Sequence, residues 1–289
     1  MRSHGLLRHV PGAEASDHLC WVYDDDDAGF DAAVRQFLAG GLARGERLLC
    51  VGERIIESLA GNAAPLGNTE ELRAGGVLGT MTLGEAYAAT GSFTPEAQLA
   101  FYDAATRRAL DDGYRGLRVV ADVGGLAADA STRAGLIRWE HVADEYMAHG
   151  PGMSAMCTYR RDLPEAALAE ATSVHPLVHA PDVASPFQVF FEDGHVAVAG
   201  SVDTFSADRL ARVLTASPVG AHGAVLDLRL LEFVDVAASR VIARWAQALA
   251  DRPVPLTLEV RGASPLVRRM WRVLALDELA PVTFAGAAA

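Results

Sequence analysis

The sequence predicts an α/β protein with two domains, a parallel-sheet domain followed by a smaller α/β domain. Its 289 residues are about twice the length of an average domain of roughly 150 residues. Hydrophobic residues make up 51% of the chain and charged residues 21%, which supplies enough apolar side chains for two cores. Short apolar runs alternate with longer segments of helical periodicity, as in an α/β sheet.

The first half of the chain contains the clearest alternation of strands and helices. Thr94 is expected to cap one of the helices, with Pro95 at its first position. Residues 60–76 contain Gly, Asn and Pro and are predicted to form a loop, and residues 1–16 are expected to be an N-terminal tail. The expected strands are 18–23, 47–51, 77–83, 117–123 and 153–159, and the expected helices are 28–43, 94–110, 132–148, 164–172 and one that begins at Ile55.

The periodicity breaks over residues 175–188, which carry three prolines. We therefore expect the domain boundary in this segment, between domains 17–184 and 185–289. In the second domain, the order β-β-α-β-α-β-α is typical of a small α/β sandwich. Its expected elements are a hairpin over 189–200 that turns at Asp193-Gly194, strands within 223–235 and at 255–262, and helices at 205–214, 236–249 and 265–274.

Charge and composition exclude several functions. The net charge is −12, and all 25 basic residues are arginines, so the chain has neither a phosphate-loop lysine nor a Schiff-base lysine. A nucleic-acid partner is not expected, because binding one needs clustered positive charge. No apolar run reaches the ~18 residues of a membrane-spanning helix, and the N-terminus lacks the apolar core of a signal peptide. These features predict a cytoplasmic protein with no membrane partner.

No catalytic motif stands out, so we expect neither enzyme activity nor a cofactor. Cys20, Cys50 and Cys157 are too scattered for a disulfide framework and are expected to be buried thiols. The imidazole and thiol groups of His18, Cys20, Cys157 and His175 suit zinc or copper, but no spacing supports a site, and we assign no metal. A redox sensor that uses Cys20 and Cys157 is an alternative.

Several candidate ligand-binding residues lie near the carboxyl ends of the expected strands, where doubly wound sheets bind ligands. Side chains alternate along a strand, so His18 and Cys20 share one face and Tyr23 points to the other. For Cys50, Trp139 and Tyr159, core packing is the alternative. The candidates are His18, Cys20, Tyr23, Cys50, Glu53, Asp122, Trp139, Glu140, Tyr159 and His175. All of them except His18 and Cys20 could line one pocket.

Six segments together resemble the MEDS domain, a sensory module found in dichloromethane-responsive regulators and in proteins with signalling output domains. They are DHLCWVYDDDD (17–27), FLAGGLARGERLLCVG (37–52), GSFTPE (91–96), GYRGLRVVADV (113–123), MCTYRRD (156–162) and SVHPLV (173–178). That module is similar to RecA/KaiC-like ATPases, which implies the same fold for the first domain. In those enzymes a phosphate-binding loop follows the first strand.

The acidic run Asp24–Asp27 stands where that loop would be. Its carboxylates would repel phosphate, so we expect no ATP hydrolysis. A solvated helix start, favoured by the helix dipole, explains the run better than a Ca²⁺ or Mg²⁺ loop does. Asp122 has the position of a metal-binding aspartate of that fold, and without a phosphate loop it is expected to be structural or to contact a ligand.

The second domain resembles a STAS domain, the fold of anti-sigma factor antagonists. The matching segments are GSVD (200–203), VLDLRLLEFVD (225–235), LTLEVRGAS (256–264) and VRRMWRVLALDEL (267–279). Phosphorylatable members carry Asp-Ser-Ser-Gly or a close variant at the start of the helix after the central strand. Here that stretch is Asp235-Val236-Ala237-Ala238, so the acceptor position falls on Ala237, and Ser239 is the nearest hydroxyl. Ser239 is therefore the only candidate for phosphorylation at this helix start.

These resemblances imply a non-enzymatic signalling regulator in transcription control or stress response. A sensory domain with a small-molecule ligand would control a STAS domain that binds an anti-sigma factor or a serine-kinase-like protein. The alternatives are a nucleotide- or small-molecule-binding ATPase relic and a STAS-based scaffold, and a homodimer is left open. The candidate partner-binding residues are Asp203, Asp235, Val236, Ala237, Ala238, Ser239 and Arg240.

Overall fold

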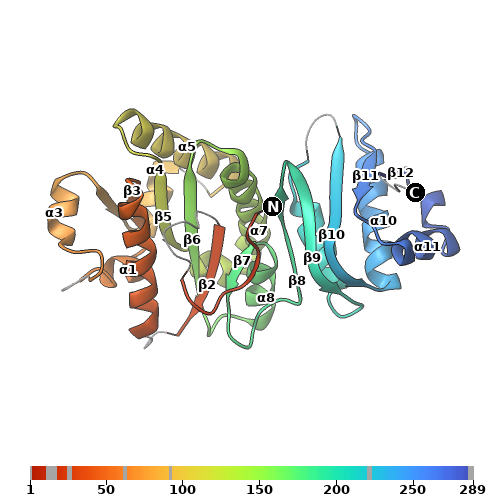
Figure 1. The fold of residues 1–289 in the computed structure, drawn as a ribbon, viewed down its shortest axis with the longest axis horizontal. Helices are drawn as coiled ribbons and strands as arrows, with labels where there is room; N and C mark the ends of the chain where they lie inside the picture. Colours follow the sequence, from red (N-terminus) through yellow and green to blue (C-terminus); the bar gives the residue numbers. More distant parts are fainter. Residues whose placement is uncertain are drawn as a thin grey trace. The chain divides into compact units, whose positions relative to one another are not determined.

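The computed structural model describes residues 2–10, 18–24, 28–60, 64–90, 93–219 and 223–285. It divides into two compact units, Met1–Ala184 (unit 1) and Ser185–Ala289 (unit 2), each with its own sheet (Figure 1). None of the helices in these ranges is both long enough and apolar enough to cross a membrane.

The described part of unit 1 is built on a seven-stranded sheet in which all neighbouring strands are parallel. The strand order is β1-β7-β2-β6-β5-β3-β4. The central strands are buried almost throughout, as expected when helices cover both faces of a parallel sheet. The strands are β1 (Gly5–Leu6), β2 (His18–Tyr23), β3 (Arg47–Val51), β4 (Leu78–Met81), β5 (Leu117–Asp122), β6 (Met153–Arg160) and β7 (Leu177–His179).

Helices cover the two faces of this sheet and form a separate core on each. Along β2, Cys20 and Val22 belong to the core under α5 and α7, whereas Trp21 and Tyr23 belong to the core under α1 (Figure 1). This alternation follows from the two-residue period of a strand. The helices are α1 (Ala28–Ala43), α2 (Glu53–Glu57), α3 (Thr69–Ala74), α4 (Leu83–Thr90), α5 (Pro95–Asp111), α6 (Gly124–Ala128), α7 (Ala130–His149) and α8 (Glu165–Ser173).

Elements α4, α6 and β12 were not predicted from the sequence, and three other short elements lie in segments for which it predicted a loop, lost periodicity or a tail. Helix α3 lies in the expected loop 60–76, and Asn68 caps it by accepting hydrogen bonds from the N–H groups of Glu70 and Glu71. Strand β7 lies in the segment where periodicity was lost. Strand β1 lies in the expected tail, joined to β7 by backbone hydrogen bonds of 2.7 Å. Elements of two to six residues are too short to show a period. Residues 11–17 of that tail lie outside the described residues.

The described part of unit 2 contains a five-stranded sheet with the order β12-β11-β10-β9-β8. Strands β8 and β9 form the predicted antiparallel hairpin, and the other neighbours are parallel. Asp193 and Gly194 have φ angles of 50° and 78°, as a tight hairpin turn requires. The elements are β8 (Phe187–Glu192), β9 (His195–Val202), α9 (Ala207–Ala216), β10 (Ala224–Val234), α10 (Val236–Ala250), β11 (Leu258–Arg261), α11 (Pro265–Val273), a 3-10 turn (Leu276–Glu278) and β12 (Val282–Phe284).

Candidate functional site

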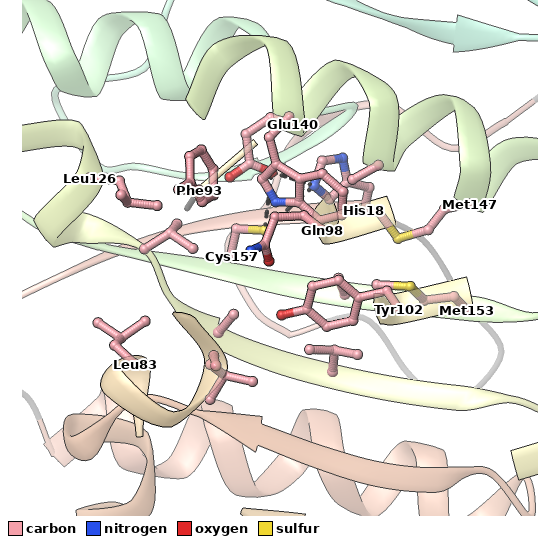
Figure 2. A pocket seen from close by; sticks show the side chains of 18 residues that line it. His18, Leu83, Phe93, Gln98, Tyr102, Leu126, Glu140, Met147, Met153 and Cys157 are labelled. Atoms are coloured by element: carbon pink, nitrogen blue, oxygen red, sulfur yellow. Dashed lines mark hydrogen bonds and ion pairs between the residues drawn. The ribbon is translucent and has the colours of Figure 1, made fainter. Parts of the chain in front are cut away.

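Four polar side chains meet in the interior of unit 1, and we call them the buried cluster: His18, Glu140, Cys157 and His175. All four are buried. The Glu140 Oε2 atom lies 3.1 Å from His18 Nε2, 3.3 Å from Cys157 Sγ and 3.5 Å from His175 Nε2. Cys157 Sγ lies 3.5 Å from His18 Nε2. Figure 2 shows three of the four, His18, Glu140 and Cys157, gathered close together.

The topology of the sheet brings these residues together. His18 opens β2 and Cys157 lies on β6, the neighbouring parallel strand, where the register pairs Cys157 with Cys20. Helix α7 packs on this face and supplies Glu140. His175 follows α8 directly and precedes β7, which pairs with the other side of β2. The cluster therefore joins four segments that are distant in the sequence.

The outer atoms of the cluster are held by a second set of residues. His18 Nδ1 lies 3.2 Å from Asp144 Oδ1, and Asp144 also pairs with Arg2 at 2.7 Å. The Tyr159 hydroxyl donates to Glu140 Oε1 at 2.7 Å. His175 Nδ1 lies 2.7 Å from the Ala171 carbonyl, which can only accept, so Nδ1 carries the proton and Nε2 a lone pair. In His18, Glu140 and His175, the second polar atom of the side chain is left to face the centre of the cluster.

Burial and mutual contacts shift the pKa values of the cluster. Burial alone would lower the pKa of His18, but hydrogen bonds to Asp144 and Glu140 raise it to about 9. Burial opposes ionisation of Glu140, yet His175 and His18 hold its pKa well below the usual range. Burial raises the pKa of the Cys157 thiol well above its usual value. Burial also lowers the pKa of His175. With no other cation bound, His18 would be an imidazolium between two carboxylates.

A small cavity of about 30 Å³ adjoins the cluster. His18, Gln98, Glu140 and Cys157 are polar residues of its lining, and Tyr102 and Met153 are among the largely apolar remainder (Figure 2). An apolar pocket with a few polar groups is typical of small-molecule sites, although drug-sized ligands need roughly 300–1,000 Å³. As it stands, the cavity has room for a molecule only slightly larger than water.

The expectation that the candidates near the strand ends line one pocket is wrong for Tyr23 and Cys50, which lie on the opposite face of the sheet from the cavity. His18, Glu140 and His175 belong to the cluster, Tyr159 holds Glu140, and Cys20 and Trp139 pack in the same core. Tyr23 and Cys50 lie in the core under α1, because their positions on the strands point that way.

Asp122 and Glu53 lie at the carboxyl-end edge of the sheet and are not among the residues that line the cavity. Asp122 accepts hydrogen bonds from the Gly124 N–H at 3.2 Å and the Tyr23 hydroxyl at 3.5 Å, and burial raises its pKa. These contacts give Asp122 a structural role at the start of α6. At the acidic run, Asp24 pairs with Arg161 at 3.0 Å, and residues 25–27 lie outside the described residues.

Asp144 contributes to this site but was not among the residues predicted from the sequence. It lies four positions after Glu140 on α7, so the two carboxylates share one helix face. That spacing was the available signal. The sequence offered Cys157 and Cys20 equally as metal-binding or redox-active thiols, and only the strand register brings Cys157 and not Cys20 into the cluster.

In unit 2, the carboxyl ends of β9 and β10 adjoin, because the Asp235 N–H donates to the Val202 carbonyl at 3.2 Å. Asp235 Oδ1 accepts from the Ala238 N–H at 2.8 Å and so caps α10. Asp203 Oδ1 accepts from the Phe205 N–H at 3.1 Å.

Apolar side chains are exposed along this edge: Phe205 at 92%, Phe233 at 53% and Val236 at 39%. Asp203 and Asp235 are half-buried, and Arg240 is exposed. We call these six residues the edge surface. The sequence did not single out Phe205 or Phe233, because exposure is not visible in a periodic pattern.

The prediction of partner binding is wrong for two residues. Ala238 and Ser239 are completely buried in the core side of α10, and the Ser239 hydroxyl lies 3.8 Å from Met270 Sδ. Ser239 therefore cannot replace the acceptor serine without opening of the helix. Ala237 is half-buried and has no hydroxyl.

Comparison with known families assigns both units. Residues 17–176, more than half of the chain, match the family model of MEDS, the MEthanogen/methylotroph, DcmR Sensory domain. Residues 187–281 match the model "Mlab, STAS domain". No curated protein matches the chain.

Two solved structures are similar to parts of the fold. One is the crystal structure of an anti-sigma factor antagonist from Mycobacterium paratuberculosis, with 24% identity, a TM-score of 0.27, and coverage of 34% of this chain and 83% of that chain. The other is the helicase MrfA bound to DNA and AMPPNP, with 12% identity, a TM-score of 0.26, and coverage of 94% and 39%. At these TM-scores neither likeness bears on function.

Proposed function

Since this chain belongs to the MEDS family and its second unit is a STAS domain, we propose that it is a signalling regulator and not an enzyme. In this proposal unit 2 binds an anti-sigma factor or serine-kinase-like protein in the cytoplasm, and unit 1 controls that binding. The observation that carries the proposal is the edge surface of unit 2, where large apolar side chains are exposed beside the start of α10.

The edge surface has the chemistry of a protein-binding site. Burying a Phe or Val side chain stabilises a complex by about 1.5–3 kcal/mol, and exposed aromatic residues are frequent anchors of interfaces. Asp203, Asp235 and Arg240 would form a polar rim around Phe205 and the other apolar residues. Arg240 would also provide a donor for a carboxylate of the partner.

Control by phosphorylation at this helix start is not part of the proposal. Ala237 occupies the acceptor position, and Ser239 is buried. Unit 1 would supply the control instead, through a small molecule in the cavity beside the buried cluster. Such a ligand changes the output only if its affinity differs between two states of the protein.

The test is affinity capture from cells of the source organism with three full-length baits. They are the natural chain, Val236→Arg in the edge surface, and Val254→Arg as the control, because Val254 is 69% exposed elsewhere in unit 2. We expect the natural chain and the control to retain an anti-sigma factor or a kinase-like protein, and Val236→Arg to lose it. The proposal fails when no such protein is retained or when both variants retain it equally.

A further inference from the structure

We propose that the buried cluster is a tetrahedral zinc site, with His18 Nε2, His175 Nε2, Glu140 Oε2 and Cys157 Sγ as the four ligands. These atoms come from four different segments and all lie within 4.8 Å of one another. The proposal goes beyond signalling by the two units, because it concerns a metal that holds unit 1 together.

The distances fit the size of a zinc site. Bonds to zinc measure about 2.3 Å for sulfur and about 2.0–2.2 Å for nitrogen or oxygen, and at tetrahedral angles they place neighbouring ligand atoms about 3.3–3.6 Å apart. The four separations given above are 3.1, 3.3, 3.5 and 3.5 Å. The other two of the six separations are at most 4.8 Å, so movements of up to about 1 Å would complete the coordination.

The surrounding residues orient the ligands as in known metal sites. Metal-binding histidines usually pass their second ring N–H to a carboxylate or a carbonyl, which fixes the tautomer. Here Asp144 takes this role for His18, and the Ala171 carbonyl takes it for His175. The Tyr159 hydroxyl holds the outer oxygen of Glu140, so the inner oxygen faces the centre.

His175 supplies an independent sign that the cluster binds a cation. Its Nε2 atom is buried and makes no hydrogen bond, and it carries a lone pair because Nδ1 holds the proton. In the neutral ring that lone pair faces the Glu140 carboxylate at 3.5 Å, where two acceptors repel each other, and burial disfavours the protonated ring that would pair with Glu140 instead. A buried polar atom without a partner costs about 1–3 kcal/mol of folding free energy, and a cation bound between the two groups would remove this cost.

The charges and the donor types favour zinc. A zinc ion and the Arg2 guanidinium would balance Glu140, Asp144 and the Cys157 thiolate, which is formed when a coordinated thiol releases its proton to solvent. Two imidazoles, one thiolate and one carboxylate suit zinc, whereas calcium and magnesium require mainly oxygen ligands. Four protein ligands leave no open position, which is typical of a structural site.

The experiment uses the full chain and cobalt(II) as a spectroscopic probe for zinc. We expect the protein, once stripped of metal by a chelator, to bind one equivalent of cobalt, with the strong visible absorption of tetrahedral coordination and a thiolate-to-metal charge-transfer band in the near ultraviolet. Zinc should displace the cobalt and abolish both signals. Cys157→Ser should lose the charge-transfer band and at least about 100-fold in affinity, more than an outer-shell change costs.

Two other buried thiols provide matched controls. Cys50→Ser alters the opposite face of the sheet, and Cys20→Ser alters the strand position paired with Cys157. Both variants should keep the band, and its loss in Cys20→Ser would overturn the assignment to Cys157. A natural chain that gives no thiolate band with cobalt and no rise in melting temperature with zinc would falsify the proposal, even when Cys157→Ser fails to fold.

Discussion

Replacing Tyr159 with Phe tests how strongly the outer contacts stabilise the buried cluster. The change removes only the hydroxyl that donates to Glu140 Oε1 at 2.7 Å, and both side chains are completely buried. A hydrogen bond to a charged group contributes about 1.5–3 kcal/mol, so we expect the free energy of unfolding of unit 1 to fall by that amount. At about 2–4 °C per kcal/mol, the melting temperature should fall by about 3–12 °C.

The measurement is urea unfolding followed by circular dichroism, with Tyr146→Phe as the control. Tyr146 also donates its hydroxyl to a carboxylate, Asp103 at 3.1 Å, but that carboxylate is 31% exposed and water can replace the donor. The control should lose less than about 1 kcal/mol. Equal losses in the two variants, or a loss below about 0.5 kcal/mol for Tyr159→Phe, would refute the reasoning from burial.

Two further predictions concern single carboxylates. Asp144→Asn should weaken zinc binding by about 10–100-fold and leave the thiolate-to-metal band in place, because Asp144 orients His18 without touching the metal. Competition with a chelating dye measures the zinc affinity, and an unchanged affinity would contradict the orienting role. Asp235→Ala should destabilise unit 2 by about 1 kcal/mol in urea unfolding, because it removes the side-chain cap of α10. Asp235→Asn keeps the accepting oxygen and should cost at most a few tenths of a kcal/mol. Similar losses of stability in the two variants would contradict the capping role.

Most of the long elements could be predicted from the sequence, whereas the shortest strands and helix α4 could not. Helix α1 and strand β2 have enough residues to display a period, and their predicted bounds agree with the structure. Strands β1 and β7 have two and three residues, and backbone pairing between them, not a side-chain pattern, makes them strands. Tertiary hydrogen bonding of this kind leaves no signal in a single sequence.

The buried cluster could be predicted only in part for a similar reason. Strand alternation correctly put His18 and Cys20 on one face of the sheet, yet the thiol that reaches the cluster belongs to Cys157. The choice depends on the register between β2 and β6 and on where α7 crosses them. Neither can be derived from spacing along the chain, so the metal-ligand set considered from the sequence contained Cys20 in the place that Glu140 takes in the structure.

The short edge strands of the unit 1 sheet also affect how this protein can associate. At one border β1 pairs only Gly5 and Leu6 with β7, and at the other β4 has four residues. A long, flat border would offer a row of free N–H and C=O groups to a strand from another chain, and such borders promote aggregation. Here few backbone groups are available at either border. The unit 1 sheet is therefore poorly suited to continue from one molecule into the next, and unit 1 of a second copy would associate with it through side chains.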